Sequence, residues 1–263
     1  MYRFLLSRQW VILTLVALAL IPTMIELGFW QLHRHEHRVE QNQLIEDNLR
    51  ARPVPVTELT GPGHEVPRDD YWRAVTATGR FDTGREVVIR QRTASDGESI
   101  GYYVLTPLVL TGGGGDGGTV LVNRGWIPAG GTLTEFPDVP AAPRGEVTVT
   151  GRLMGDETTE ASGIKDKQGL PERQYMLINS AQQAERLDTP VLGGYIELTE
   201  PAGETPEPVA EPDHDSIGPH MAYAVQWWLF AAGVPVGWAV LVRRERNDRR
   251  AARPEEKPAP VPA

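Results

Sequence analysis

The histidines are the side chains of this sequence that could ligate a metal or change charge near neutral pH. His220 lies just before a long uncharged apolar run, and Tyr223 and Trp227 follow it three and seven residues later. On a helix these three side chains share one face. An imidazole above an aromatic, apolar surface could ligate the iron of a flat hydrophobic macrocycle. An aromatic belt at a membrane surface gives the same pattern, and the spacing alone favours the belt.

Two further polar residues lie within apolar sequence. Gln226 follows His220 by six residues, and an amide so close to lipid needs a protein or ligand partner. Glu26 interrupts the first apolar run of the chain. Its carboxylate could face Gln226 or His220 if the two runs pack together, or it could snorkel towards the lipid headgroups.

A second group of histidines, His33, His35 and His37, follows the first apolar run. Residues two apart on a helix do not share a face, so the three rings point in different directions from the helix axis. This spacing does not favour a single metal site, and a solvated polar surface near the headgroups is the better interpretation.

Arg124 lies in the segment Asn123-Arg124-Gly125-Trp126, at the end of an expected strand. A guanidinium there could pair with a carboxylate of its own domain, or with a ligand carboxylate such as a heme propionate. Without further information, the ion pair within the domain is favoured.

Two apolar runs must position these groups. The first extends from Trp10 to Ile25 and, past Glu26, to Leu32; the second, Ala222–Val242, has 21 residues without a charge. The second would span roughly 31 Å as a helix, which is the thickness of a bilayer core. Arg3 and Arg8 precede the first run and five arginines follow the second, which predicts that both termini are cytoplasmic.

A cleaved signal peptide is the alternative for the first run, because Ala17-Leu18-Ala19 resembles a processing site. Apolar sequence continues beyond it, however, which favours a retained membrane span. The run also begins too early for an organelle transit peptide, so we expect a bacterial plasma membrane.

The composition excludes several classes of function. The formal net charge is −9 although arginines gather at both ends, so the middle of the chain is strongly acidic and unsuited to nucleic acid. The sequence contains no cysteine, so disulfides cannot stabilise the outer domain. The missing thiolates also argue against a carrier of Cu(I).

The fold class expected is an α+β membrane protein, with two transmembrane helices flanking an antiparallel β-rich domain that forms a small barrel or sandwich with one or two short helices. Strands are predicted over 71–81, 86–91, 100–111, 119–127, 146–154 and 191–199, and a short helix over 180–187 that Asn179 or Ser180 caps. The glycine run 112–118 lacks a following Lys-Ser/Thr, so it predicts a hairpin loop, not a phosphate site.

The expected order of segments follows from these elements. It consists of a cytoplasmic terminus over 1–9, a span over 10–32, an extracytoplasmic part over 33–221, a second span over 222–242 and a disordered cytoplasmic tail over 243–263. Within the extracytoplasmic part we expect a helical extension over 33–50, a β-rich core over 71–199 and a linker over 200–219.

Several motifs together resemble one known family. They are Leu27-Gly28-Phe29-Trp30-Gln31-Leu32-x-Arg34, Gly79-Arg80-Phe81, Gly101-Tyr102-Tyr103-Val104-Leu105-Thr106-Pro107-Leu108, Val120-Leu121-Val122-Asn123-Arg124-Gly125-Trp126-Ile127-Pro128 and His220-x-x-Tyr223-Ala224-x-Gln226-Trp227-Trp228-x-Phe230-Ala231. With two terminal apolar runs, this pattern resembles the Surfeit locus protein 1 family of assembly factors for cytochrome c oxidase. One departure is His37-Arg38, where the family usually has an aromatic residue followed by lysine.

The resemblance implies a non-enzymatic role in which heme a is helped towards subunit I of the oxidase. The proposed heme ligand of the family corresponds to His220, and Gln226 and Trp227 match the same motif. The implied partners are subunit I, the heme a synthesis machinery and the lipid bilayer. An alternative is an interaction scaffold that stabilises oxidase subunits without binding heme, using the outer domain and the small-residue surface of Gly233 and Gly237.

A sensor or an enzyme with two anchors is a third possibility. The short cytoplasmic ends offer no output domain, and the sequence shows no nucleophile–base or metal-binding motif, so both are disfavoured.

Overall fold

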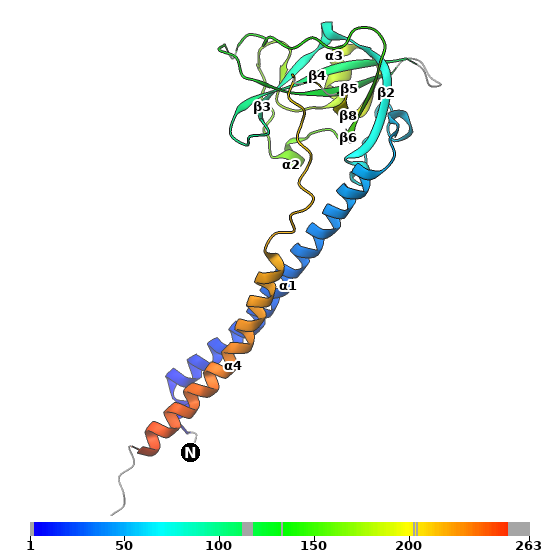
Figure 1. Cartoon of the computed structure of the whole chain (residues 1–263). Coiled ribbons are helices and arrows are strands. Elements are labelled where there is room, and N and C mark those ends of the chain that lie inside the picture. Colours follow the sequence, from blue (N-terminus) through cyan, green and yellow to red (C-terminus); the bar gives the residue numbers. More distant parts are fainter. Residues whose placement is uncertain (1–2, 112–117, 133, 202, 204, 252–263) are drawn as a thin grey trace, which may run out of the picture. The chain divides into compact units, whose positions relative to one another are not determined.

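The computed structural model describes residues 3–111, 118–132, 134–201, 203 and 205–251. It contains two compact units, one formed by residues 1–42 and 215–263 and the other by residues 43–214. The first is helical and the second is β-rich (Figure 1). This confirms an α+β chain with apolar helices towards its two ends and a β-rich centre.

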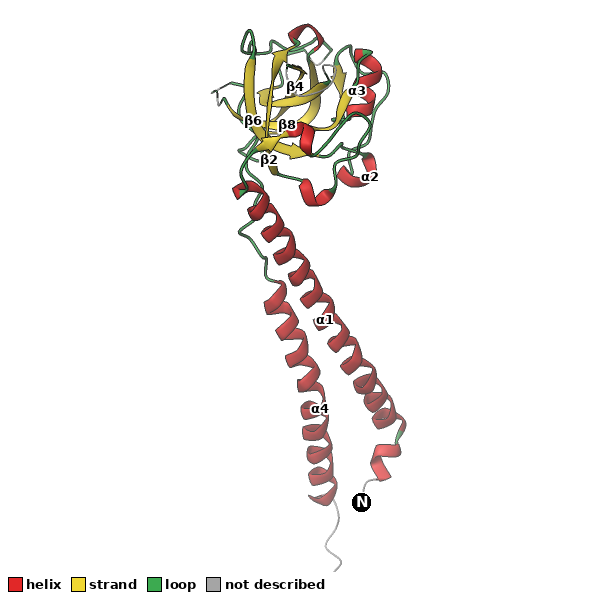
Figure 2. Cartoon of the chain, turned by 90° about the vertical axis from the view of Figure 1, so that its right-hand side faces the viewer, coloured by secondary structure: helices red, strands yellow, loops and turns green. Residues whose placement is uncertain are grey.

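The helical unit is built from the two apolar runs. Helix α1 extends over Arg8–Arg50 and helix α4 over His220–Ala251, both drawn in red in Figure 2. The two helices run antiparallel, since Thr14 meets Trp238 while Gln31 meets His220. Both are long and apolar enough to cross a bilayer, as judged by length and composition.

The ends of these helices agree only partly with the sequence-based expectation. The helical extension over 33–50 is confirmed, because α1 continues to Arg50, and Pro53 follows three residues later. The disordered tail predicted over 243–263 is wrong for residues 243–251, which prolong α4. Extending an existing helix costs little, and the Glu245–Arg249 ion pair of 2.7 Å supports this last part. Residues 252–263 lie outside the described residues.

The described residues of the β unit form one sheet. Its strands are β1 (Val54–Pro55), β2 (Arg73–Phe81), β3 (Val87–Thr93), β4 (Ile100–Leu110), β5 (Thr119–Pro128), β6 (Val147–Met154), β7 (Gln174–Tyr175) and β8 (Val191–Glu200). Two short helices accompany them, α2 (Thr159–Ser162) and α3 (Ser180–Leu187). Single turns of 3-10 helix lie at Arg3–Leu6, Val56–Glu58, Arg68–Asp70 and Thr83–Arg85.

The predicted strands and the predicted helix are confirmed within one or two residues. Asn179 caps α3 by accepting a hydrogen bond of 2.9 Å from the Gln182 amide, as its residue type predicts. The loop predicted from the glycine run connects β4 to β5, but residues 112–117 themselves lie outside the described residues.

The strand order is β1-β2-β6-β8-β5-β4-β3-β7, and β2 also pairs with β4. The β2–β4 pairing therefore joins the two ends of the row β2-β6-β8-β5-β4. The predicted antiparallel pairing is confirmed for most neighbouring strands, but β5 and β8 pair in parallel. The chain between β5 and β8 includes β6, β7, α2 and α3, which is long enough for a crossover connection. The short pairs β1–β2 and β3–β7 are also parallel.

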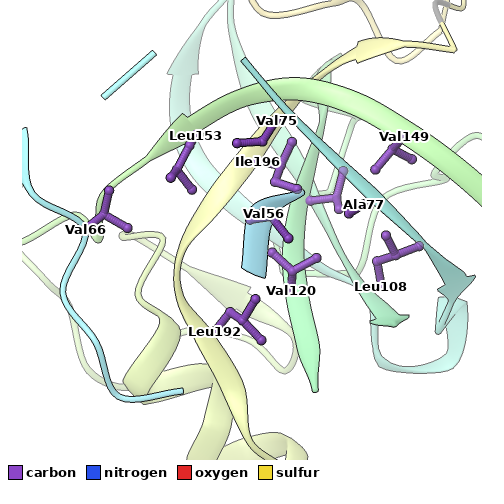
Figure 3. Packing of buried hydrophobic residues seen from close by; sticks show 11 residues of the cluster. Val56, Val66, Val75, Ala77, Leu108, Val120, Val149, Leu153, Leu192 and Ile196 are labelled. Atoms are coloured by element: carbon purple, nitrogen blue, oxygen red, sulfur yellow. The ribbon is translucent and has the colours of Figure 1, made fainter. Parts of the chain in front are cut away.

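The core of the β unit follows the alternation of its strands. In β2, Val75 and Ala77 face the same interior as Val120 of β5 and Ile196 of β8 (Figure 3). Strand β5 is buried at nearly every position because both of its faces are covered. Leu121, on its other face, packs in a second cluster that includes Leu187 of α3.

Candidate functional site

His220 begins helix α4, and its imidazole contacts helix α1. The local sequence sets this start, because Gly218 has a positive φ of 65° and the Pro219 carbonyl accepts the first helical hydrogen bond from Tyr223. The half-buried ring places Nδ1 2.9 Å from Oε1 of Gln31. An amide oxygen only accepts hydrogen bonds, so Nδ1 donates and carries the ring proton.

The other ring nitrogen, Nε2, keeps its lone pair in this arrangement, and no hydrogen bond engages it among the described residues. Gly218 lies beside it, since a Cβ at that position would be 3.5 Å from Nε2. Such a contact has an ordinary van der Waals length, so Gly218 borders the edge of the ring that bears the lone pair. A neutral imidazole whose Nδ1 is engaged and whose Nε2 makes no hydrogen bond to a described residue fits an axial ligand of heme iron.

The position of His220 depends on how closely α1 and α4 approach one another. Gly28 of α1 packs directly on Trp228, so closely that a Cβ on this glycine would lie 2.2 Å from the indole Nε1. Ala224 and Ala231 are the buried residues of the described part of α4. Small residues at these points let two helix backbones come together. Gln31, one turn beyond Gly28, can therefore reach His220.

The remaining residues of the histidine motif flank this seam. Tyr223 is 47% exposed, Gln226 is also exposed, and Trp227 is half-buried with its ring edge-on to Phe230 at 6.1 Å. They present an aromatic surface beside His220, and contact between that surface and a heme stays a prediction.

The polar residues of α1 differ in their exposure and in their partners. Glu26 is exposed, and the partner of His220 is Gln31 instead. His33 is exposed, whereas His35 is half-buried with an unpartnered Nδ1. His37 is exposed and lies 3.7 Å from Glu40. No cluster of three or more metal-ligating side chains occurs among the described residues.

Arg124 lies in the β unit and is occupied by partners of its own domain. Its Nη1 donates to the Glu86 carboxylate at 2.9 Å and its Nη2 donates to the Pro140 carbonyl at 2.8 Å. Both charged side chains are more than nine-tenths buried. The ion pair that the sequence favoured is therefore present, and a role in binding a propionate stays a prediction.

The neighbours of Arg124 explain why the segment Asn123–Trp126 carries such distinctive residues. The Asn123 side chain accepts from the Gly125 amide at 3.1 Å. Gly125 has a φ of 125°, and a Cβ there would lie 2.3 Å from the Glu207 carbonyl. Trp126 donates from its indole to the Arg92 carbonyl and exchanges backbone hydrogen bonds with Glu207. The segment thus connects the end of β5 to β3 and to the chain near Glu207.

Sequence reasoning missed a buried ionic cluster in the β unit. Arg92 pairs with Glu157, and Arg152 lies 3.2 Å from Glu197. Burial raises the pKa of the Glu197 carboxyl, and the Arg152 guanidinium offsets part of that rise. Burial also raises the pKa of Tyr195 well above its usual value. Charged residues within or next to mostly apolar strands were the available signal, but which of them pair depends on the tertiary structure.

Sequence reasoning also missed Gln31 as the partner of His220. Its place in the motif leaving the first apolar run was a signal, but nothing local to either helix shows that the two residues meet. That contact requires the register between α1 and α4.

Comparison with known proteins now identifies the family. The model of the SURF1 family matches residues 18–232, which include both the Gln31 and the His220 segments. The chain belongs to the SURF1 family. An uncharacterised SURF1-like protein of Mycobacterium tuberculosis is 32% identical over 269 residues, covering 98% of this chain and 94% of the relative. Surfeit locus protein 1 of Homo sapiens is 27% identical over 248 residues, covering 88% of this chain and 76% of the relative. The protein of that name from Xenopus tropicalis is 31% identical over 152 residues, covering 52% of this chain and 46% of the relative.

Proposed function

We propose that this SURF1-family protein is a membrane-anchored assembly factor for cytochrome c oxidase that holds heme a on His220 on its way to subunit I. The observation that carries the proposal is the imidazole at the start of α4, with Nδ1 bonded to Gln31 and Nε2 without a hydrogen bond to any described residue. Membership of the family supports the assignment to oxidase assembly.

Anchoring in a membrane is part of this proposal. Large apolar side chains such as Leu18, Leu229 and Val236 are each more than 60% exposed on α1 and α4. Such surfaces are unfavourable in water and are typical of helices that face lipid. Arg3 and Arg8 ahead of the first apolar run, together with the arginines at the end of α4, support two cytoplasmic termini in a bacterial plasma membrane, with the β unit outside.

His220 and the residues around it would each make a different kind of contact with the heme. Heme iron accepts an imidazole nitrogen as an axial ligand, and Nε2 of His220 would supply it. The exposed ring of Tyr223 and the half-buried ring of Trp227 would contact the apolar macrocycle, and the amide of Gln226 could bond to its polar substituents. We propose binding and transfer for these residues, and no catalytic step.

The test is a heme spectrum of the full-length protein. We would co-express the chain with the heme a synthesis enzymes, purify it in detergent and compare wild type with His220→Ala and with His33→Ala. His33 is an exposed histidine of the same helical unit and serves as the matched control. We expect wild type and His33→Ala to carry heme a and His220→Ala to lose most of it. Equal heme content in all three proteins, or none in wild type, would refute the ligand role.

A scaffold that does not bind heme is the second candidate, favoured by a separate surface. A Cβ added at Gly233 or Gly237 meets no atom within 4 Å among the described residues, so this small-residue face of α4 is open to another membrane helix. Gene deletion separates the two functions. A scaffold predicts less oxidase with a full heme a content, whereas heme delivery predicts that the remaining oxidase lacks heme a.

A further inference from the structure

The contact between Gln31 and His220 places a hydrogen-bond acceptor behind the nitrogen that is not proposed to bind iron. Both residues are half-buried, and Oε1 of Gln31 lies 2.9 Å from Nδ1 of His220. A neutral imidazole exists as two tautomers, and only the tautomer with a proton on Nδ1 offers a lone pair on Nε2. The Gln31 oxygen stabilises that tautomer.

The same arrangement is common around metal-bound histidines. Such a histidine almost always donates its second ring N–H to an oxygen, which fixes the orientation of the ring and raises the basicity of the coordinating nitrogen. Carboxylates, backbone carbonyls and waters usually supply that oxygen. A glutamine amide has the same acceptor chemistry without a charge, which suits a position among apolar residues.

We propose that Gln31 is a positioning residue for His220. By accepting the Nδ1 proton it holds the imidazole in the tautomer and orientation that present Nε2 for coordination. The role in heme binding rests on the function proposed above, whereas the choice of tautomer is a property of the protein without heme.

The helix pair has other contacts that keep α1 and α4 together. Gly28 packs on Trp228, the Phe29 ring lies edge-on to the same indole at 5.6 Å, and Thr14 accepts a hydrogen bond of 3.1 Å from Trp238. A substitution at Gln31 leaves these contacts in place. The residue can therefore be changed without separating the helices, which makes its effect on the ring measurable.

Three variants of the full-length chain isolate this effect. Gln31→Met keeps the length of the side chain and removes the acceptor. Gln31→Glu restores an acceptor for the Nδ1 proton. Gln41→Met makes the same change as the first variant at an exposed position of α1 in the same unit. The Gln41 side chain makes no hydrogen bond to a described residue.

The first measurement is the tautomer of His220 without heme, read from the nitrogen NMR signals of ¹⁵N-histidine-labelled protein in detergent micelles. The spectrum of His220→Ala assigns the signal. We expect the Nδ1–H tautomer in wild type, Gln31→Glu and Gln41→Met, and a shift towards the Nε2–H tautomer in Gln31→Met. A wild-type ring protonated on Nε2, or an unchanged tautomer in Gln31→Met, overturns the inference.

The second measurement is the affinity of the same proteins for heme a, with the spectrum of the bound iron as a further readout. Loss of such a supporting oxygen weakens metal binding about 10- to 100-fold, so we expect this loss in Gln31→Met and rescue in Gln31→Glu. If His220→Ala loses heme but Gln31→Met binds it like wild type, the inference fails while the proposed function stands. If His220→Ala binds heme like wild type, the proposed function fails, and the tautomer result still decides whether Gln31 positions the ring.

Discussion

The contact between Gly28 of α1 and Trp228 of α4 gives a direct test of how these helices pack. In Gly28→Ala the new Cβ would lie 2.2 Å from Nε1 and 2.5 Å from Cδ1 of Trp228. Non-bonded contacts of carbon are normally about 3.5 Å, so the indole or the whole helix must move by about 1 Å or more. The indole has little freedom to yield, because its ring also packs edge-on against Phe29.

The cost of this movement can be estimated from overpacking in protein interiors, which is about 1–3 kcal/mol. That cost lowers the equilibrium constant for pairing of the two helices by about 5- to 150-fold. Alanine is also a better helix former than glycine by up to about 1 kcal/mol in water, which acts in the opposite direction. Gly233→Ala provides the matched control, because its Cβ meets no described atom within 4 Å while any gain in helix propensity is the same.

The assay uses the absence of native cysteines. Spin labels on single cysteines at the exposed positions Leu15 of α1 and Val236 of α4 report the distance between the helices by pulsed EPR in micelles. We expect Gly28→Ala to lengthen or broaden the distance distribution, and Gly233→Ala to match the unsubstituted protein. Superimposable distributions in all three proteins would refute the packing described for Gly28 and Trp228.

The remaining predictions concern the β unit and are checked by thermal unfolding of the full-length chain. Arg124→Met leaves the Glu86 carboxylate buried without its cation, so we expect the free energy of unfolding to fall by about 3–5 kcal/mol. Adding Glu86→Met should restore part of this loss. An unchanged unfolding midpoint in Arg124→Met would instead favour a ligand role for Arg124. Asn179→Ala removes the cap of α3 and should cost about 1 kcal/mol, whereas no change would mean that the cap is dispensable. Burial raises the pKa of Asp156 in the folded state above the unfolded value of about 3.9, so the folded state binds this proton more tightly. The protonated carboxyl therefore stabilises the fold at low pH, and this contribution to the free energy of unfolding is lost as the pH rises through the raised pKa. Asp156→Asn should therefore gain stability relative to wild type as the pH increases from about 4, and a constant difference would contradict this.

The elements of the fold were largely predictable because they depend on local patterns. The absence of charges over 222–242 predicts an apolar helix, and proline after Arg50 predicts where α1 ends. Alternation of apolar residues predicts the long strands, and Asn179 predicts the start of α3. Each of these signals lies within a few residues of the feature it specifies.

Pairing between distant segments was not predictable in the same way. The parallel pairing of β5 with β8 was missed, because strand alternation is the same in parallel and antiparallel neighbours. The ionic pairs of Arg92 and Arg152 were missed because they depend on which segments, distant in the sequence, are adjacent in the fold. Helix α4 continued beyond the apolar run because helix propagation is cheap once a long helix exists.

The sequence by itself determined which groups are available: an imidazole and aromatic rings at the start of one apolar run, and a glutamine near the end of the other. Only the tertiary structure decided that Gln31 and His220, 189 residues apart, are hydrogen-bond partners. The physical reason is that a hydrogen bond of 2.9 Å requires the helix backbones to approach closely and in one register. That register is set by Gly28 against Trp228, a contact between residues on different helices.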